Sequence, residues 1–168
     1  MTAIAAGTLA ELETLATAIN AGQFSNAGGL TTIAVTDTTI DATTLAARID
    51  SYDTINGDGA SGTTDMTLAS GATINVDSGE IAHMLADEDA GRLTIGDQAI
   101  TVTGAITVDV ANSLGTTTDG KVTATIDTSE TVEELATLNA DGGTNDLTIA
   151  IRAADATAAT AAQLNTIN

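Results

Sequence analysis

The sequence predicts an α/β repeat fold: an elongated, solenoid-like stack of strand–helix units that covers residues 1–168. One observation behind this prediction is a repeated phrase, in which a β-branched run leads into an amphipathic stretch containing Leu. It starts at Thr39, Thr73 and Thr125, and more loosely at Ile106. An interval of roughly 30 to 45 residues between copies is typical of repeat architectures. We therefore divide the chain into units of roughly 1–41, 42–76, 77–108 and 109–168.

The second observation is the composition of the apolar residues. They make up 43% of the chain, but aromatic residues make up only 1%. The interior must therefore be thin and aliphatic. Such layers favour a stack in which each unit buries its apolar face against its neighbours.

The elements follow from local patterns along the chain. Leu9, Leu12 and Leu15 recur at helical spacing within residues 8–20, and Thr8 with Glu11 forms a capping box at the start of this helix. β-branched runs and Gly/Asp breaks define the other elements. These are strands at 30–35 and 38–40 separated by a turn at 36–37, a helix at 42–52, strands at 66–68 and 72–76 with a hairpin or corner at 70–71, a helix capped by Asp77 that includes residues 81–85, a β region at 92–108 broken at 96–97 and 104, a helix at 110–114, a strand at 121–126, a helix at 129–138, a strand at 147–152 and a helix from residue 156.

The alternation of strand and helix implies largely parallel strand neighbours. The alternative is a β-rich domain with Greek-key strands, in which the Ala- and Leu-bearing segments are short connecting helices. Uneven spacing between successive helices is the observation that keeps this alternative open.

The charge of the chain restricts its partners. There are 23 acidic residues against four basic ones, and the formal net charge is -19. Nucleic acid binding depends on Lys and Arg that displace counterions from phosphates, so we expect no nucleic acid partner. We also expect no membrane insertion, because no window of about 20 apolar residues is present. The first residues lack the basic segment and the apolar core of a secretory signal.

Four segments carry a resemblance to a known family. Residues 7–12, 131–139 and 160–167, together with 33–38, resemble the Thr/Ala/Asp-rich repeats of giant bacterial cell-surface proteins, such as the marine cyanobacterial protein of swimming motility. The resemblance implies a long extracellular protein with a structural role in a calcium-rich environment. It implies no catalytic residues.

The residues themselves do not predict an enzyme. His83 is the only histidine, and Glu80 and Asp87 lie on the same helical face, where we interpret the group as a solvated histidine among acids. No G-x-S-x-G phrase and no cysteine is present. Gly-rich segments at 56–59 and 141–143 lack the lysine of a P-loop and are interpreted as turns.

Calcium is the cofactor that the sequence favours, because hard oxygen ligands on flexible loops suit this ion. A cluster at 87–89 is a further candidate. No cluster matches the EF-hand pattern, and Asp, Asn and Gly are also ordinary turn residues. The predicted metal ligands are Asp53, Asn56, Asp58 and Asp65 in one loop, and Asp141, Asn145 and Asp146 in another.

The resulting prediction is a non-enzymatic structural module of an extracellular or cell-surface bacterial protein, serving as scaffold, stalk or fibre subunit. Its expected partners are further copies or neighbouring repeats, because the ends of a stack are open. The first alternative is a calcium-dependent adhesion or ligand-binding module. The second is an ice-binding protein, because Thr31-Thr32, residues 36–39 and Thr101 with Thr103 place hydroxyls on strands.

Overall fold

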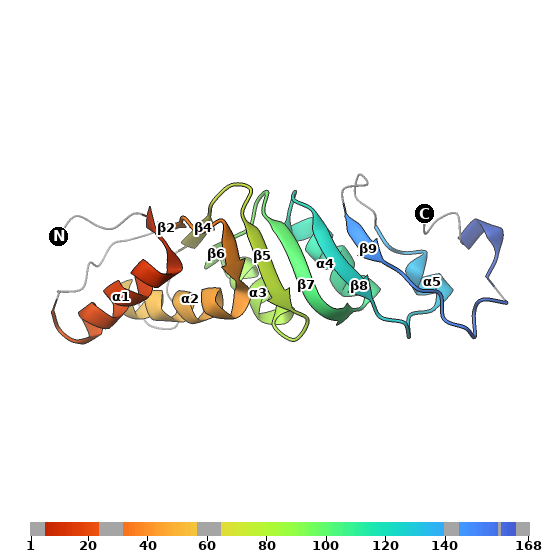
Figure 1. Cartoon of the computed structure of the whole chain (residues 1–168), viewed down its shortest axis with the longest axis horizontal. Coiled ribbons are helices and arrows are strands. Elements are labelled where there is room, and N and C mark those ends of the chain that lie inside the picture. Colours follow the sequence, from red (N-terminus) through yellow and green to blue (C-terminus); the bar gives the residue numbers. More distant parts are fainter. Residues whose placement is uncertain (1–5, 24–31, 57–64, 140–144, 158, 164–168) are drawn as a thin grey trace.

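The protein is an α/β protein in which helices alternate with the strands of two parallel sheets. The computed structural model describes residues 6–23, 32–56, 65–139, 145–157 and 159–163, with only the backbone for 52–56. The elements follow one another along the long axis of the molecule, from α1 at one end to α5 near the other (Figure 1). The bounds are β1 Ala6–Gly7, α1 Leu9–Asn20, β2 Thr32–Val35, β3 Thr39–Asp41, α2 Ala42–Asn56, β4 Asp65–Leu68, β5 Thr73–Asp77, α3 Ile81–Asp89, β6 Leu93–Thr94, β7 Ala99–Ile106, α4 Val108–Thr117, β8 Val122–Ile126, α5 Val132–Leu135 and β9 Asp146–Thr148.

One sheet has the strand order β1-β2-β4-β6, and the other has the order β3-β5-β7-β8-β9. Every pairing among the described strands is parallel, which confirms the expected parallel neighbours. The antiparallel pairs that a Greek-key arrangement needs are found nowhere among them. In Figure 1, α3 and α4 lie behind the five-stranded sheet, so that one face of that sheet is covered by helices.

The core is built from rows of apolar side chains that run across the strands. Ile40, Ile74, Ile100 and Val122 are register partners on four successive strands, and each has an exposed fraction of 0%. Each strand of the row therefore covers the inner side chain of its neighbour. The four-stranded sheet repeats this arrangement with Ile33, Met66 and Leu93, which are at most 2% exposed.

Chain corners connect the two sheets. β2 and β3 belong to different sheets, and so do β4 and β5, so the turns at 36–37 and 70–71 are corners rather than hairpins. β6 and β7 are separated in the same way, at the Gly96-Asp97 break that the sequence predicts. A further irregularity lies at Gly104, where φ is 95° and the register between β7 and β8 shifts.

The capping box at the start of α1 is confirmed. Thr8 accepts a hydrogen bond from the Glu11 backbone N–H, and the Glu11 carboxylate accepts one from the Thr8 backbone N–H at 2.9 Å. Thr131 and Glu134 form the same box at the start of α5. Thr160 and Gln163 form it once more, ahead of a short helical turn at residues 161–163.

Other boundaries differ from the prediction. Asp77 does not cap α3: its Oδ1 accepts from the Gly79 N–H at 3.0 Å, which turns the chain after β5, and Glu80 occupies the cap position without a side-chain bond. α5 is shorter than predicted because Thr131, and not Ser129, caps it. α4 is longer than expected, since Thr107 starts it two residues earlier and it continues through Thr117. β9 is shorter than the strand expected at 147–152.

Candidate functional site

The predicted calcium ligands of the first loop are only partly placed by the structure. Asp53 and Asn56 lie in the last turn of α2, and Asp58 lies outside the described residues. Asp65 begins β4, where its Oδ2 accepts a hydrogen bond from the Thr94 hydroxyl at 2.7 Å. Its other oxygen, Oδ1, is buried and accepts no hydrogen bond from the part of the chain that the structure describes.

Two of the metal ligands predicted for the second loop contact residues of the five-stranded sheet or next to it. Asp141 lies outside the described residues. The Asn145 side-chain oxygen accepts from the Val122 N–H at 2.9 Å, where it continues the hydrogen-bonding edge of β8. Asp146 Oδ2 lies 3.7 Å from the Lys121 ammonium, and both side chains are exposed. Across the described ranges, no group of three or more His, Cys, Asp or Glu side chains is arranged to hold a metal ion.

The third acidic cluster has a structural partner. Asp87 is buried, and its Oδ1 accepts a hydrogen bond from Arg92 Nη2, so the cluster connects α3 to the start of β6. His83 is exposed on α3.

All four basic side chains of the chain form ion pairs with acids. The pairs are Arg48 with Glu13, Arg92 with Asp87, Lys121 with Asp146, and Arg152 with Asp155. The Arg48 pair joins α2 to α1 at 2.8 Å. Every Lys and Arg side chain is therefore paired within the fold. The 23 acidic residues outnumber the four basic ones, and this excess gives the formal charge of -19.

The outer face of the five-stranded sheet carries rows of polar side chains. One row contains register partners on all five strands, and three of its five members are exposed. The two Thr members are half-buried. A second row has two exposed polar members, Thr125 and Thr148, next to the exposed Ala105. The five-member row is Asp41, Asn75, Thr101, Thr123 and Asp146.

Sequence reasoning missed a buried polar network at the corners between the sheets. Gln98 is 3% exposed, and its amide nitrogen donates to the carbonyl oxygens of Leu68 at 3.3 Å and Ala69 at 3.0 Å. Its side-chain oxygen accepts from the Gly96 N–H at 2.6 Å. Thr118, which directly follows α4, donates its hydroxyl to the Gln98 carbonyl oxygen at 2.5 Å. The network therefore joins three successive corners of the fold.

Asp97 belongs to the same corners but is exposed to solvent. Its carboxylate accepts from the Ser70 hydroxyl at 2.5 Å and from the Gly71 N–H at 3.2 Å. The Ser70 and Gly71 hydrogen bonds lower the pKa of Asp97. The sequence signal for these residues was a Gly-Asp turn, which does not reveal that Gln98 is buried.

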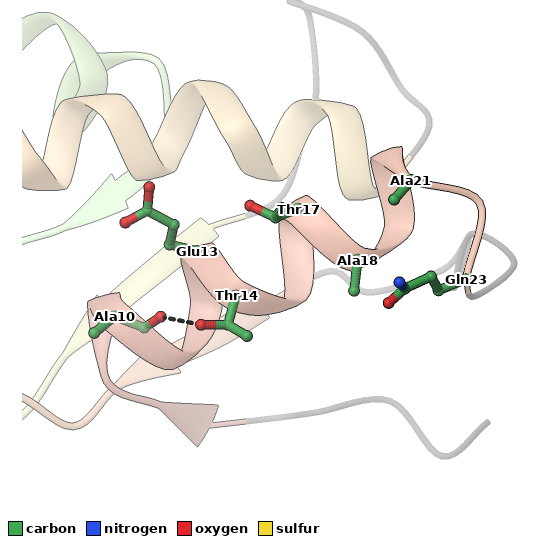
Figure 2. A pocket seen from close by; sticks show the side chains of 7 residues that line it. All are labelled: Ala10, Glu13, Thr14, Thr17, Ala18, Ala21 and Gln23. Carbon is green, nitrogen blue, oxygen red and sulfur yellow. Dashed lines mark hydrogen bonds between the residues drawn. The ribbon is translucent and has the colours of Figure 1, made fainter.

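Two hollows lie at the α1 end of the molecule. The larger, of about 530 Å³, runs along the outside of α1 and the turn after it, where Thr14 donates its hydroxyl to the Ala10 carbonyl (Figure 2). The smaller, of about 310 Å³, lies between β1 and α1 and is lined by Ala6, Gly7, Glu11, Leu12 and Leu15. Neither lining contains a nucleophile paired with a base.

None of the helices in the described ranges combines the length and the apolar character that crossing a membrane requires. The chain was compared with protein-family models, curated proteins and solved structures, and none of them matches it.

Proposed function

We propose that this chain is a non-enzymatic structural module of an extracellular bacterial surface or filament-forming protein, in which the strand–helix units form a solenoid. The observation that carries the proposal is the fully buried row of Ile40, Ile74, Ile100 and Val122. Each unit supplies one strand to this row and covers the previous one, which is how repeat proteins gain stability from nearest neighbours.

The charge distribution supports a spacer or stalk at a surface. Because all four basic side chains are paired within the fold, the remaining acids repel other copies along the sides of the molecule. This repulsion is screened beyond about 8 Å at physiological ionic strength and over shorter distances in more saline surroundings. The module would therefore stay soluble and separate laterally.

The ends support the expected association with further copies or repeats. At one end, the hollow between β1 and α1 exposes part of Leu15. Toward the other end, Ile151 follows β9 and is 38% exposed. Apolar contacts at the ends combined with repulsion at the sides would favour growth along the long axis.

A deletion in register tests the modular stack. Val76 and Val102 are register partners, so removal of residues 77–102 joins Val76 to Thr103 and takes out one complete turn of the chain. We expect this variant to unfold cooperatively in urea and to scatter X-rays as a particle shorter by about 5 Å, the spacing of one strand. The control is a deletion of residues 77–89, which removes α3 but leaves β6 and β7 and so takes out only part of the turn. Equal damage by the two deletions would contradict the proposal.

A calcium-dependent adhesion module is a second candidate, favoured by Asp65. Its buried Oδ1 has no hydrogen-bond donor among the described residues, and a buried carboxylate oxygen needs a donor or a cation. Thermal unfolding followed by circular dichroism, with millimolar calcium and again with excess chelator, tests this function. A rise in midpoint that Asp65→Asn abolishes supports calcium binding, whereas an unchanged midpoint in the native chain rejects it.

An ice-binding surface is a third candidate, favoured by the row through Asn75, Thr101 and Thr123. Strand pairing spaces these side chains by about 4.8 Å along the row, which gives a regular array of hydroxyl and amide groups. The test is inhibition of ice recrystallisation by the native chain and by Thr123→Tyr. Thr14→Tyr on α1 is the control, because it adds the same ring away from this row. If the native chain leaves recrystallisation unchanged, this candidate is rejected.

A further inference from the structure

The two ends of the molecule carry features that complement each other. At the α1 end, the hollow of about 310 Å³ between β1 and α1 is lined by Leu12, Leu15 and Glu11, together with the first strand. Toward the C-terminal end, Ile151 is the large apolar side chain that is exposed among the described residues, and Arg152 follows it. One end thus offers an apolar hollow beside an acid, and the other offers an apolar side chain beside a cation.

The hollow lies where the stack lacks a further layer. β1 is the first strand of the four-stranded sheet, and in the part of the chain that the structure describes it pairs with β2 alone. Leu12 on α1 is buried, whereas Leu15, about one helical turn later, is half-buried. An apolar side chain placed in this hollow would cover Leu15 and extend the core.

The acid at the hollow has a carboxylate oxygen available for a cation. Glu11 Oε2 accepts from the Thr8 N–H at 2.9 Å and from the Thr8 hydroxyl at 3.0 Å. These bonds lower the pKa of Glu11, so its carboxylate is ionised at neutral pH. Its other oxygen, Oε1, accepts no hydrogen bond from the described residues.

The exposed positive charge lies at the opposite end. The side chains of Lys121 and Arg152 are 52% and 39% exposed, but those of Arg48 and Arg92, nearer the α1 end, are only 14% and 24% exposed. Arg152 donates to Asp155 through Nε and Nη2 and to a backbone carbonyl through Nη1. A guanidinium has five N–H donors, so these bonds leave donors for a second carboxylate.

We propose that copies of this chain dock head to tail, with Ile151 of one copy in the hollow between β1 and α1 of the next and Arg152 beside Glu11. This inference rests on the proposed structural function and gives its association a defined interface. The contact joins two different surfaces, so each docked copy still presents one free hollow and one free Ile151. Further copies therefore add along the long axis.

The charges select this contact over the two symmetric ones. Two α1 ends brought together would place the Glu11 carboxylates of both copies in one interface. Two C-terminal ends would do the same with the Arg152 guanidinium groups. Like charges facing each other across an interface are unfavourable, whereas the head-to-tail contact places opposite charges together.

The first experiment is sedimentation velocity of the native chain over a range of concentrations. We expect the sedimentation coefficient to rise with concentration. Leu15→Glu and Ile151→Glu each place a charge in the contact, so each variant should stay monomeric with a native circular dichroism spectrum. Ser113→Glu, which adds the same charge to an exposed position of α4, is the control and should associate like the native chain. Association of both end variants as strong as that of the native chain would overturn the proposal.

The second experiment mixes the two end variants. Leu15→Glu keeps an intact C-terminal end, and Ile151→Glu keeps an intact hollow. The mixture should therefore form dimers that do not grow further, although each variant alone is monomeric. A mixture that remains monomeric at concentrations where the native chain associates would overturn head-to-tail docking.

The failure of this inference can be told apart from failure of the proposed function. A native chain that is monomeric at every concentration overturns the docking but not the modular stack, because the deletion of residues 77–102 tests the stack within a single chain. If that deletion and its control damage the fold equally, the proposed stack is wrong whether or not the copies associate.

Discussion

Gly120 lies directly against the backbone carbonyl of Gln98, so close that a Cβ at position 120 would overlap the carbonyl oxygen. The neighbouring Thr118 makes this approach necessary, because its hydroxyl donates to the same carbonyl at 2.5 Å and accepts from the Gly120 N–H at 2.9 Å. The corner after α4 is thereby fixed onto the corner before β7.

Gly120→Ala should destabilise the fold by roughly 1–3 kcal/mol, the usual cost of forcing extra volume into a packed site. The obstructing atoms are backbone, so relief requires a shift of the chain. Urea unfolding measures the loss. Gly115→Ala is the control: its added Cβ meets only the Asn145 side-chain nitrogen at 3.6 Å, and it lies in α4, where Ala is favoured over Gly by about 1 kcal/mol. Equal stability of the two variants would show that the corner adapts freely.

Gln98→Leu should be more damaging than its change in size suggests. The substitution removes the donor to the Leu68 and Ala69 carbonyls and the acceptor for the Gly96 N–H. Each buried group left without a partner costs about 1–3 kcal/mol. Thermal unfolding followed by circular dichroism measures the effect, and the exposed Gln23→Leu is the control. If Gln98→Leu has the same unfolding midpoint as the native chain, the corners do not depend on this amide.

Ile100→Ala tests the buried row of the five-stranded sheet. Ile100 is 0% exposed between Ile74 and Val122, so truncation leaves a cavity and should cost about 2–5 kcal/mol. The matched control is Ile151→Ala, because Ile151 is the large apolar side chain that is 38% exposed. Equilibrium denaturation of both variants gives the comparison. Similar free energies of unfolding for the two would be inconsistent with a row that holds the layers together.

Acid should destabilise the protein partly through Asp97. Its pKa is lowered on folding by the Ser70 hydroxyl first and the Gly71 N–H second. An acid with a lowered folded pKa stabilises the fold above its ordinary pKa, and the contribution is lost as the pH falls through the folded value. Ser70→Ala should therefore reduce the slope of stability against pH below about pH 4. Ser113→Ala, which removes a hydroxyl from α4 far along the chain, should leave that slope unchanged.

Local patterns predicted the α/β class and most of the elements, because caps and β-branched runs act within a few residues. Thr8 and Glu11 identify the start of α1 without tertiary information. Asp77 shows where such reasoning fails, since Asp is suited both to helix caps and to turns, and the chain uses it for a turn.

The candidate site was less predictable. Nothing in the sequence around Gln98 indicates that its amide is buried against Leu68 and Ala69, about thirty residues earlier in the chain, because that contact depends on how the corners stack. The sequence predicts Asn145 as a metal ligand because it lies in an acidic loop. In the structure its side-chain oxygen accepts from the Val122 N–H and continues the hydrogen-bonding edge of β8.

The register partners Asp41, Asn75, Thr101, Thr123 and Asp146 occupy equivalent places on five strands, although the chain between consecutive members differs in length. Insertions and deletions in the connecting segments can therefore be absorbed at the surface without displacing a strand. Unequal recombination between the connecting segments of the gene would add or remove complete turns of the chain. The length of the stack would then change by whole strands.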